Sequence, residues 1–478
     1  MKGTRTGMIG SVIDGIARKA ERVADSVSAS LFEPVIRLGV TGLSRSGKTV
    51  FITSLVANLL DRGRMPQLRA AAEGRISSAF LQPQPDDTVP RFEYEAHLAA
   101  MTGARPRWPQ STRSISQLRL SFRVQPTGII GAFRRPRVVH LDIVDYPGEW
   151  LLDLPLMELS FKEWSRQALA LAKKREEQSQ RFLNLLANVD ASAPLDELAG
   201  QWLAKGFTDY LASARNAGYS ACAPGRFLMP GDLDGSPALT FCPLPETANK
   251  RGSLYREFSR RYEAYKAKVV KPFFRDHFAR IDRQIVLVDA LGAVHDGPPA
   301  VADLRLAMAD VLQAFKPGRN IWLSTVLGKR RVEKILFAAT KADYLHHTQH
   351  AKLTALMQAL LREARDRAAF SGAETDSIAL ASLRATVEEA HDHNGQVLDC
   401  VRGTLLDTGK EVAMYAGELP DDPGEILNAA AEGVKNWLDA DYTVMKFAPA
   451  KISLKPGGGP PHIRLDKAAE FLLGDRLR

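Results

Sequence analysis

The sequence is poor in cysteine and contains no long apolar run. Its 478 residues include three cysteines, which are far apart and form no C-x-x-C pair. This pattern excludes a disulfide framework and a sequence-local zinc motif, and it fits a reducing compartment. No stretch of about 18 uninterrupted apolar residues occurs, so we expect no membrane-spanning helix. We therefore predict a cytoplasmic protein.

The charge balance is moderately basic. The chain has 64 Lys and Arg against 55 Asp and Glu, a net charge of +9. Such an excess permits anionic partners but does not select nucleic acid over a membrane or a nucleotide. We therefore predict no specific nucleic-acid partner. A hydrophobic content of 45% and a charged content of 25% are typical of a globular protein with a sizeable core.

Residues 1–33 show helical periodicity. Apolar residues recur at intervals of three and four, which places them on one face of a helix. This face is expected to pack on the protein itself. A second interpretation stays open, in which the helix binds an anionic membrane surface or an inner-membrane protein through its basic residues, and the protein is peripheral at the inner membrane. The basic residues are Lys2, Arg5, Arg18, Lys19 and Arg22.

The stretch "GLSRSGKT" follows a short apolar segment, 34–40, that is typical of a buried strand. In the pattern Gly-x-x-x-x-Gly-Lys-Ser/Thr, the glycines let backbone amides point at phosphates, the lysine reaches the β and γ phosphates, and the hydroxyl binds Mg²⁺. We therefore predict a nucleoside triphosphate site at the start of a helix. Its predicted residues are Gly42, Ser44, Arg45, Ser46, Gly47, Lys48, Thr49 and Val50.

A second strand, within "VVHLDIVDYPGEW" (138–150), ends at Asp145. A carboxylate there is expected to hold Mg²⁺ beside the phosphate loop. Gly148 completes an Asp-x-x-Gly pattern that resembles the γ-phosphate sensor of GTPases. Glu149 stands where Ras-like GTPases carry a glutamine that orients the attacking water. A carboxylate can accept a hydrogen bond from water, but it adds negative charge next to phosphate, so we expect slow intrinsic hydrolysis. Lys48, Gly148 and Glu149 are candidate catalytic residues.

The turn that reads the base follows an apolar strand within "KILFAATKADYL" (334–345). Thr340, Lys341 and Asp343 resemble the guanine-reading Asn-Lys-x-Asp motif, with threonine in place of asparagine. Asp343 would accept hydrogen bonds from guanine that adenine cannot offer. Further on, Ser382 and Leu383 resemble the loop that supports the guanine O6. An ATPase in which Asp343 does not contact the base stays open, as does an adaptor with a structural nucleotide.

The first switch loop is expected in "STRSISQLRLSFRV" (111–124). Thr112 or Ser114 could supply a hydroxyl to Mg²⁺ there. Arg113 could neutralise charge on the transferred phosphoryl group, as a built-in arginine finger does, or it could face solvent.

The domain organisation follows from the motif order. We predict an α/β fold with a P-loop, Ras-like core sheet that has helices on both faces. Two connections within this core are longer than the usual loops of compact domains, so we expect them to form inserted segments. The predicted parts are an N-terminal helix (1–33), a first half of the core (34–150) with an excursion (62–110), a mainly helical insertion (151–282), a second half (283–395) and a C-terminal segment packing on the core (396–478).

Several histidines follow the base-reading turn. His346, His347 and His350 lie on a predicted helix, and His391 and His393 form another pair. We interpret them as solvated surface rather than as metal ligands. The region after 445 reads as strands joined by a Gly-Pro turn and a closing helix, without chemistry.

Taken together, the motifs resemble the YcjX-like proteins, bacterial P-loop NTPases associated with stress response. The motifs themselves predict GTP or GDP and Mg²⁺ as ligands. The resemblance spans nearly the whole chain and implies a cytoplasmic protein with a Ras-like nucleotide-binding core and inserted helices, in a family whose members are described both as ATPases and as GTPases. It leaves a link to inner-membrane partners open. It is carried by "GLSRSGKT", "TRSISQLRL", "DYPGEWLLDLPL", "RFLMPGDLDGSPALTFCPLP", "KPFFRDHFARIDRQIVLVDAL", "TKADYL" and "ASLRAT".

Overall fold

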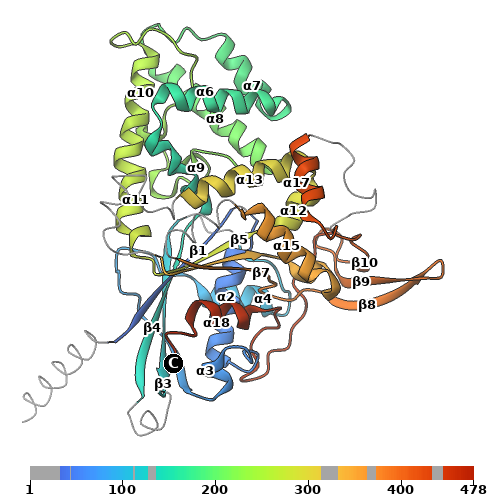
Figure 1. Cartoon of the computed structure of the whole chain (residues 1–478). Helices are drawn as coiled ribbons and strands as arrows, with labels where there is room; N and C mark the ends of the chain where they lie inside the picture. Colours follow the sequence, from blue (N-terminus) through green and yellow to red (C-terminus); the bar gives the residue numbers. More distant parts are fainter. Residues whose placement is uncertain are drawn as a thin grey trace, which may run out of the picture.

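A computed structural model gives the fold (Figure 1). Several predicted features lie outside the residues it describes: the N-terminal helix, Ser44, and the switch-loop residues Thr112 and Arg113. The described ranges are 33–43, 45–110, 114–126, 136–313, 332–362, 373–432 and 445–478.

A seven-stranded sheet forms the centre of the molecule. Its strand order is β2-β3-β4-β1-β5-β6-β7, and the five strands from β4 to β7 in this order are parallel. β3 is antiparallel to both of its neighbours. The strands are β1 (Val35–Gly42), β2 (Ile76–Gln82), β3 (Ser116–Val124), β4 (Arg137–Asp145), β5 (Arg283–Val288), β6 (Lys334–Ala339) and β7 (Glu374–Ala379).

Helices cover both faces of this sheet. Alternate side chains of a strand point to opposite faces, and Ile285 and Leu287 of β5 belong to one core while Val286 and Val288 belong to the other. The first core includes α2 (Lys48–Asp61) and α18 (Leu465–Leu473); the second includes α12 (Ala290–Asp296), α13 (Pro298–Gln313) and α15 (His350–Leu360). The two-faced α/β prediction is confirmed.

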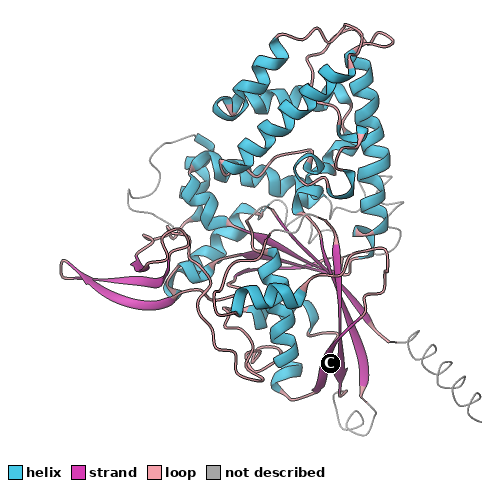
Figure 2. Ribbon diagram, turned by 180° about the vertical axis from the view of Figure 1, so that it is seen from behind, coloured by secondary structure: helices cyan, strands magenta, loops and turns pink. Residues whose placement is uncertain are grey.

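The residues between β4 and β5 are mainly helical, and Figures 1 and 2 show them stacked at one end of the sheet. Ser160 begins the first long helix with a capping box, in which its hydroxyl and the Glu163 carboxylate each accept from the other's backbone amide. Aromatic rings fill the interior, and Trp164 stacks on Tyr262 at 5.0 Å between ring centroids. The helices are α6 (Phe161–Lys174), α7 (Glu176–Ala187), α8 (Glu197–Asn216), α9 (Gly225–Leu228), α10 (Leu254–Tyr265) and α11 (Lys271–Asp276), preceded by the 3₁₀ turns η1 (Gly148–Asp153) and η2 (Pro155–Glu158).

The 62–110 excursion has secondary structure of its own, α3 (Arg69–Ala72) and α4 (Tyr94–Thr102), and it also supplies β2, whose edge pairing with β3 extends the main sheet. One prediction of local structure needs correction. The predicted strands after 445 are wrong: the chain there forms only isolated bridges before α18, because its prolines lack the amide that a ladder needs and its glycines are unfavourable in strands.

A second, antiparallel sheet has the order β10-β9-β8. Its strands are β8 (Val387–His393), β9 (Gln396–Thr404) and β10 (Glu411–Met414), and α17 (Pro423–Glu432) follows. The β8–β9 hairpin spans the predicted boundary at 395.

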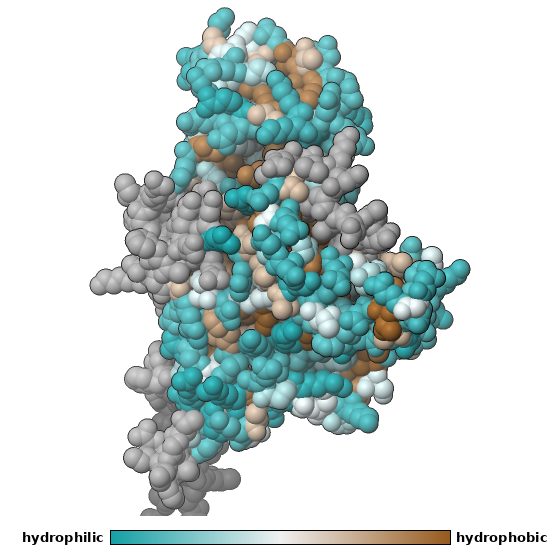
Figure 3. Space-filling view, turned by 45° about the vertical axis from the view of Figure 1, so that its right-hand side comes forward, coloured by the Kyte–Doolittle hydropathy of each residue, from teal (hydrophilic) through white to brown (hydrophobic). Residues whose placement is uncertain are grey.

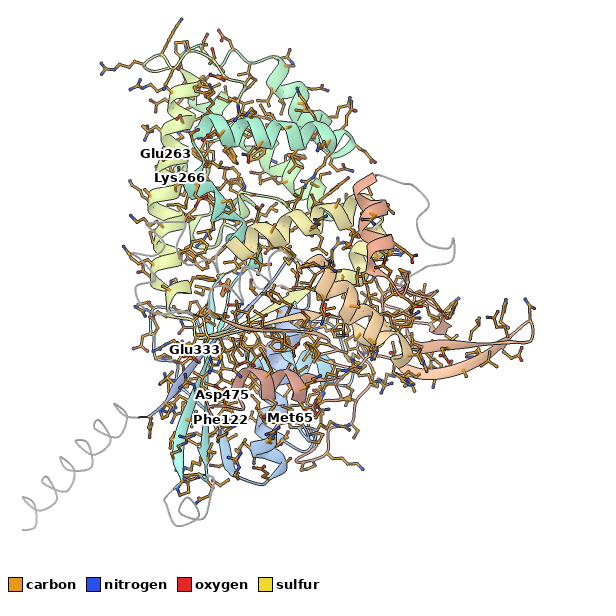
Figure 4. All side chains as sticks on the ribbon, viewed as in Figure 1. Met65, Phe122, Glu263, Lys266, Glu333 and Asp475 are labelled. Carbon is orange, nitrogen blue, oxygen red and sulfur yellow. The ribbon has the colours of Figure 1, made fainter. Side chains whose placement is uncertain are left out.

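A buried cation anchors the end of the chain to the sheet. The Arg283 side chain is 1% exposed, and its Nη2 donates to Asp475 Oδ2 at 2.7 Å, while its Nη1 pairs with Glu333. Figure 4 labels Glu333, directly before β6, and Asp475, which follows α18 and Gly474. Two carboxylates thereby compensate the buried guanidinium.

One face of the molecule is mainly polar. On the face in Figure 3, hydrophilic residues dominate and hydrophobic ones gather in small groups. Among the described helices, none combines the length and the apolar character needed to cross a membrane.

Candidate functional site

The predicted motifs meet at the carboxyl edge of the parallel strands. β1 runs into the phosphate loop at Gly42, and its Val40 pairs with Asp145 at the end of β4. β6 ends immediately before Thr340. In the sheet, β2, β3 and β4 lie on one side of β1, and β5, β6 and β7 lie on the other side. The strand order therefore reverses at β1, and ligands of open α/β sheets bind at such a topological switch point.

The phosphate loop wraps back on itself. Arg45 and Gly47 have positive φ angles of 67° and 81°, and Gly47 begins α2. Lys48 Nζ donates to the Gly42 carbonyl at 2.9 Å, which holds the ammonium within the loop. Ser46 Oγ is buried and has no hydrogen-bond partner among the residues that the structure describes. A polar loop at a helix N-terminus with an unused hydroxyl suits a phosphate.

The Asp-x-x-Gly glycine lies against the phosphate loop. A Cβ on Gly148 would lie 2.2 Å from the Gly42 carbonyl oxygen, so only glycine allows this approach. The backbone after β4 is thus in direct contact with the loop expected to hold phosphates. Glu149 follows Gly148 and lines the adjoining cavity.

The donor set beside the loop suits Mg²⁺. Thr49 supplies a hydroxyl in the first turn of α2, and Asp145 supplies a carboxylate next to Val40 in the sheet. Both side chains are largely buried, at 7% and 1% exposure. Hard oxygen donors of this kind, completed by phosphate and water, are those that Mg²⁺ prefers.

At the other end of the site, Asp343 is held from the neighbouring loop. Its Oδ2 accepts from the Ala385 amide at 2.8 Å, and its carbonyl accepts from the Thr386 hydroxyl. Burial raises the pKa of the Asp343 carboxyl to about 6, although the hydrogen bond from the Ala385 amide opposes the shift. The carboxyl lines the cavity and is rigidly placed for a ligand.

Lys341 adopts a left-handed backbone conformation with φ 60°, and its ammonium pairs with Asp289. Asp289 also caps α12 by accepting from the Gly292 amide at 3.0 Å. Thr340 Oγ1 donates to the Val288 carbonyl at 3.2 Å, so threonine anchors this turn to β5. The turn is therefore tied to the strand beside it.

One cavity of about 380 Å³ joins both ends, a volume typical of small-molecule sites. Most predicted nucleotide-binding residues line it, namely Arg45, Ser46, Gly47, Lys48, Thr49, Val50, Thr340, Lys341, Asp343, Ser382 and Leu383. Gly42, Asp145 and Gly148 are predicted site residues that do not belong to its lining. The sequence analysis missed Trp108, Pro109, Met229, Tyr344, Leu406, Lys446 and Phe447.

The missed residues come from segments far apart in the chain. Trp108 Nε1 donates to the Phe447 carbonyl at 2.8 Å, and the Tyr344 and Phe447 rings meet edge to face at 5.2 Å. These contacts close the base end of the cavity. In the sequence, the only local sign of these contacts is an aromatic residue in a polar loop, Trp108. That residue alone does not indicate that its partner is Phe447.

A smaller cavity of about 150 Å³ adjoins the first one. It shares Leu43, Arg45 and Glu149 with the phosphate end of the main cavity, shares Lys341, Tyr344 and Lys446 with its base-reading side, and reaches Arg215 near the end of α8. The helical segment therefore borders the phosphate end directly.

The turn η1 is joined to α9 by close backbone contact. A Cβ on Gly225 would lie 1.9 Å from the Glu149 carbonyl oxygen. Asp153 Oδ1 accepts from the Gly225 amide at 2.7 Å and its Oδ2 accepts from the Tyr265 hydroxyl at 2.5 Å. Burial raises the pKa of Asp153 to about 6. Trp150 Nε1 donates to the carbonyl of Met229, a cavity residue, at 3.0 Å.

The sheet order and the phosphate loop place this chain among the P-loop NTPase class of α/β proteins with a Ras-like core. Its sequence matches the model of the YcjX-like family, DUF463, over residues 36–477, and the chain belongs to that family.

Two relatives carry the name "Ras-like GTPase YcjX". The one from Escherichia coli (strain K12) is 40% identical over 461 residues, covering 93% of this chain and 96% of the relative. The one from Shewanella oneidensis (strain MR-1) is 33% identical over 473 residues, covering 92% and 94%. The predicted resemblance is confirmed.

Proposed function

We propose that the protein binds GTP with Mg²⁺ and hydrolyses it slowly, as a conformational switch. The observation that carries this proposal is the buried Asp343 carboxyl, which lines the same cavity as Lys48 and Thr49. A nucleotide with its phosphates at the loop would direct its base toward Asp343. The relatives' printed name supports the same activity. The family resemblance adds a role in bacterial stress response.

Guanine suits the base end of the cavity. Ionised Asp343 is acceptor-only and can take the N1–H and N2–H hydrogen bonds of guanine. Adenine would leave this buried carboxylate without those donors, which costs about 1–3 kcal/mol per unpaired group. The stem of Lys341 would lie over the base.

Hydrolysis transfers the γ-phosphoryl group to water. The water oxygen forms a bond to the γ phosphorus while the bond to the β–γ bridging oxygen breaks, giving GDP and phosphate. Lys48 would neutralise charge on the β and γ phosphates, and the Gly148 amide would donate to the terminal phosphate. Glu149 would accept a hydrogen bond from the water, at the cost of added negative charge.

Thr49 and Asp145 would hold the Mg²⁺ ion, with Thr112 as a further hydroxyl ligand. The ion supplies charge neutralisation between the β and γ phosphates when bound. Asp145 pairs with Val40 of β1, which places this donor near the loop.

A switch needs an element that responds to the γ phosphate. Gly148 touches the phosphate loop, and the adjoining Glu149 backbone touches Gly225 of α9. A shift at Gly148 on γ-phosphate loss would therefore reach the helical segment through direct contact. We take this segment as the output element.

An ATPase of the same fold is the second candidate, because Thr340 replaces the asparagine of the guanine motif. The deciding experiment is competition of GTP, ATP and xanthosine triphosphate against a fluorescent guanine nucleotide, with wild type and Asp343→Asn. Xanthine carries an acceptor where guanine carries the N2 donor, so the side-chain amide introduced by this substitution should bind it. We expect the variant to lose GTP affinity by about 100-fold or more and to gain affinity for xanthosine triphosphate.

The control is Asp310→Asn. Asp310 is another carboxyl whose pKa burial raises to about 6, but it does not line the cavity. Equal displacement of the probe by ATP and GTP from wild type would overturn the guanine assignment. Equal phosphate release by wild type and Lys48→Ala would overturn hydrolysis in favour of an adaptor with a structural nucleotide.

A further inference from the structure

Two histidines and a carboxylate converge beside the base-reading turn. His346 and His347 follow that turn, and Glu388 projects from β8. One ligand atom from each of the three lies within 4.8 Å of the others. The interpretation of His346 and His347 as solvated surface is not contradicted by this cluster and stays a prediction, to which a metal site is the alternative. For His350 the interpretation is wrong, because its ring is buried and faces the Ala342 carbonyl at 2.8 Å.

The spacing of these atoms suits a metal ion. His347 Nδ1 lies 2.8 Å from Glu388 Oε2, and His346 Nε2 lies 3.8 Å from the same oxygen. In a tetrahedral zinc site with bonds of about 2.0–2.2 Å, ligand atoms are separated by roughly 3.3–3.6 Å. One of the two observed distances is shorter than this range and the other is longer. Small side-chain rotations would therefore bring the three ligand atoms to the spacing of a zinc site.

The outer contacts of His346 match those of a metal ligand. Its Nδ1 lies 3.2 Å from Asp399 Oδ2 and 3.0 Å from the Thr348 hydroxyl. A carboxylate on the far ring nitrogen keeps the proton on Nδ1 and leaves the Nε2 lone pair for the metal. Asp399 comes from β9, so the support is held by a different strand from Glu388.

The charges around the site allow a divalent ion. Two neutral imidazoles and one carboxylate would leave a net charge of about +1 with the ion. The Asp399 carboxylate, on the far side of the His346 ring, would stabilise this positive charge. The Arg384 guanidinium, 3.4 Å from Glu388 Oε1, would destabilise it. The side chains of His346, Glu388 and His347 are 13%, 24% and 64% exposed, so an ion can reach them and water can complete the coordination.

We propose that His346, His347 and Glu388 bind a divalent transition-metal ion of the zinc class, apart from the Mg²⁺ of the nucleotide. Nitrogen donors with a carboxylate favour zinc over Mg²⁺ or Ca²⁺. The ion would link the turn after Asp343 to β8. Ala385 and Thr386, just before β8, donate hydrogen bonds to Asp343. A bound ion would therefore make the base-reading end more rigid.

The test is titration of nucleotide-free, full-length protein with Zn²⁺ in a calorimeter after dialysis against a chelator, and with Co²⁺ by visible absorption. We expect one ion per chain. His346→Ala and Glu388→Gln should each weaken binding by about 10-fold or more. His391→Ala is the matched control, because this exposed histidine pairs with Glu389 on the same strand and lies outside the cluster.

Glu388→Gln keeps the shape of the side chain, and thermal unfolding without metal verifies that each variant folds. A wild type that binds no Zn²⁺ or Co²⁺, or variants that bind as wild type does, would overturn the proposal and leave only a surface ion-pair cluster. The metal alone is the probe, so the result does not depend on GTP.

A separate observation concerns Arg215 in the smaller cavity. Its Nη1 is buried and has no hydrogen-bond partner among the described residues, although a buried guanidinium nitrogen normally has one. Arg215 lines the smaller cavity together with Arg45 and Glu149 of the phosphate end, and this cavity extends to Asp289 and Lys341 beside the base-reading turn. We infer, resting on the proposed function, that Arg215 donates to the phosphoryl oxygens during transfer and neutralises their charge.

Single-turnover GTP hydrolysis by Arg215→Ala tests this role. We expect a loss of about 100-fold in rate with GTP affinity changed less than about threefold, and partial rescue by Arg215→Lys. The control is Arg166→Ala, an exposed arginine of α6. If wild type hydrolyses GTP and Arg215→Ala matches it, the Arg215 role is overturned. If wild type does not hydrolyse GTP, the proposed function itself fails.

Discussion

The two ends of the main cavity are built in different ways. At the phosphate end, one uninterrupted stretch, 45–50, supplies most of the lining, and its contacts are local, such as that from Lys48 to Gly42. The base end combines 108–109, 340–344, 381–383 and 446–447. Trp108 and Phe447 meet there although 339 residues separate them.

This difference separates two kinds of recognition. A phosphate is recognised by backbone amides and a helix terminus, which a short sequence can provide alone. A base needs a shaped, dry pocket with a few fixed polar groups, which only packed segments can provide. Variants at the two ends should therefore differ in effect.

The largest effect is expected from Lys48→Ala at the phosphate end. Removing the ammonium should weaken GTP and GDP binding by about 100-fold or more, because charge-assisted hydrogen bonds contribute about 1.5–3 kcal/mol each. Fluorescent-nucleotide titration measures this. Lys455→Ala, at an exposed lysine away from the cavity, should bind as wild type does. Equal affinities for the two variants would remove the phosphate loop from the site.

At the base end, we expect GTP affinity to depend on pH through the Asp343 carboxyl. Burial raises the pKa of Asp343 from 3.8 to about 6, and guanine needs the ionised form. GTP affinity should be constant above about pH 7 and fall about tenfold per pH unit below 6, as protonation competes with binding. The terminal phosphate of GTP also takes up a proton at about pH 6, so the comparison with Asp343→Asn isolates the contribution of the carboxyl. The fall in affinity at low pH should be smaller in Asp343→Asn than in wild type, and equal profiles for the two proteins would contradict the role of Asp343.

The same pKa shift changes the stability of the fold in the opposite sense to GTP affinity. The native state binds this proton more tightly than the unfolded chain does, so the contribution of Asp343 to stability falls as pH rises from about 4 to about 6. Affinity and stability should therefore change with opposite signs.

A smaller effect is expected from Trp108→Ala, which opens the base end without removing a charged contact. The change removes the hydrogen bond to the Phe447 carbonyl and part of the cavity wall. We expect GTP affinity to fall by about 3- to 10-fold, and Trp108→Phe, which keeps an aromatic ring, to lose less. Nucleotide titration and dissociation rates measure both, and a larger loss in Trp108→Phe than in Trp108→Ala would contradict a packing role.

The smallest effect on nucleotide affinity is expected from Asp153→Ala, which belongs to neither end. It leaves the Gly225 amide and the Tyr265 hydroxyl without their acceptor, so the free energy of unfolding should fall by about 2–4 kcal/mol. GTP affinity should change by less than about threefold. Urea unfolding and nucleotide titration compare it with Asp234→Ala, at an exposed position. A large affinity loss would show that the helical segment is part of the binding site.

Much of the core was predictable because its signals are local. The apolar runs ending at Gly42, Asp145 and Ala339 became β1, β4 and β6, since strands buried on both faces are nearly continuous in hydrophobic residues. The 62–110 excursion was harder, because β2 is an edge strand and its partner β3 lies about forty residues away.

The sequence by itself determined the phosphate loop, the order of the strands that carry the motifs and the family, because these depend on residues close together in the chain. Only the tertiary structure decided which aromatic residues close the base end, that His346 and His347 meet Glu388, and that Arg215 lies next to the phosphate loop. Such contacts depend on packing between segments that are far apart in the chain, and no local pattern encodes their partners.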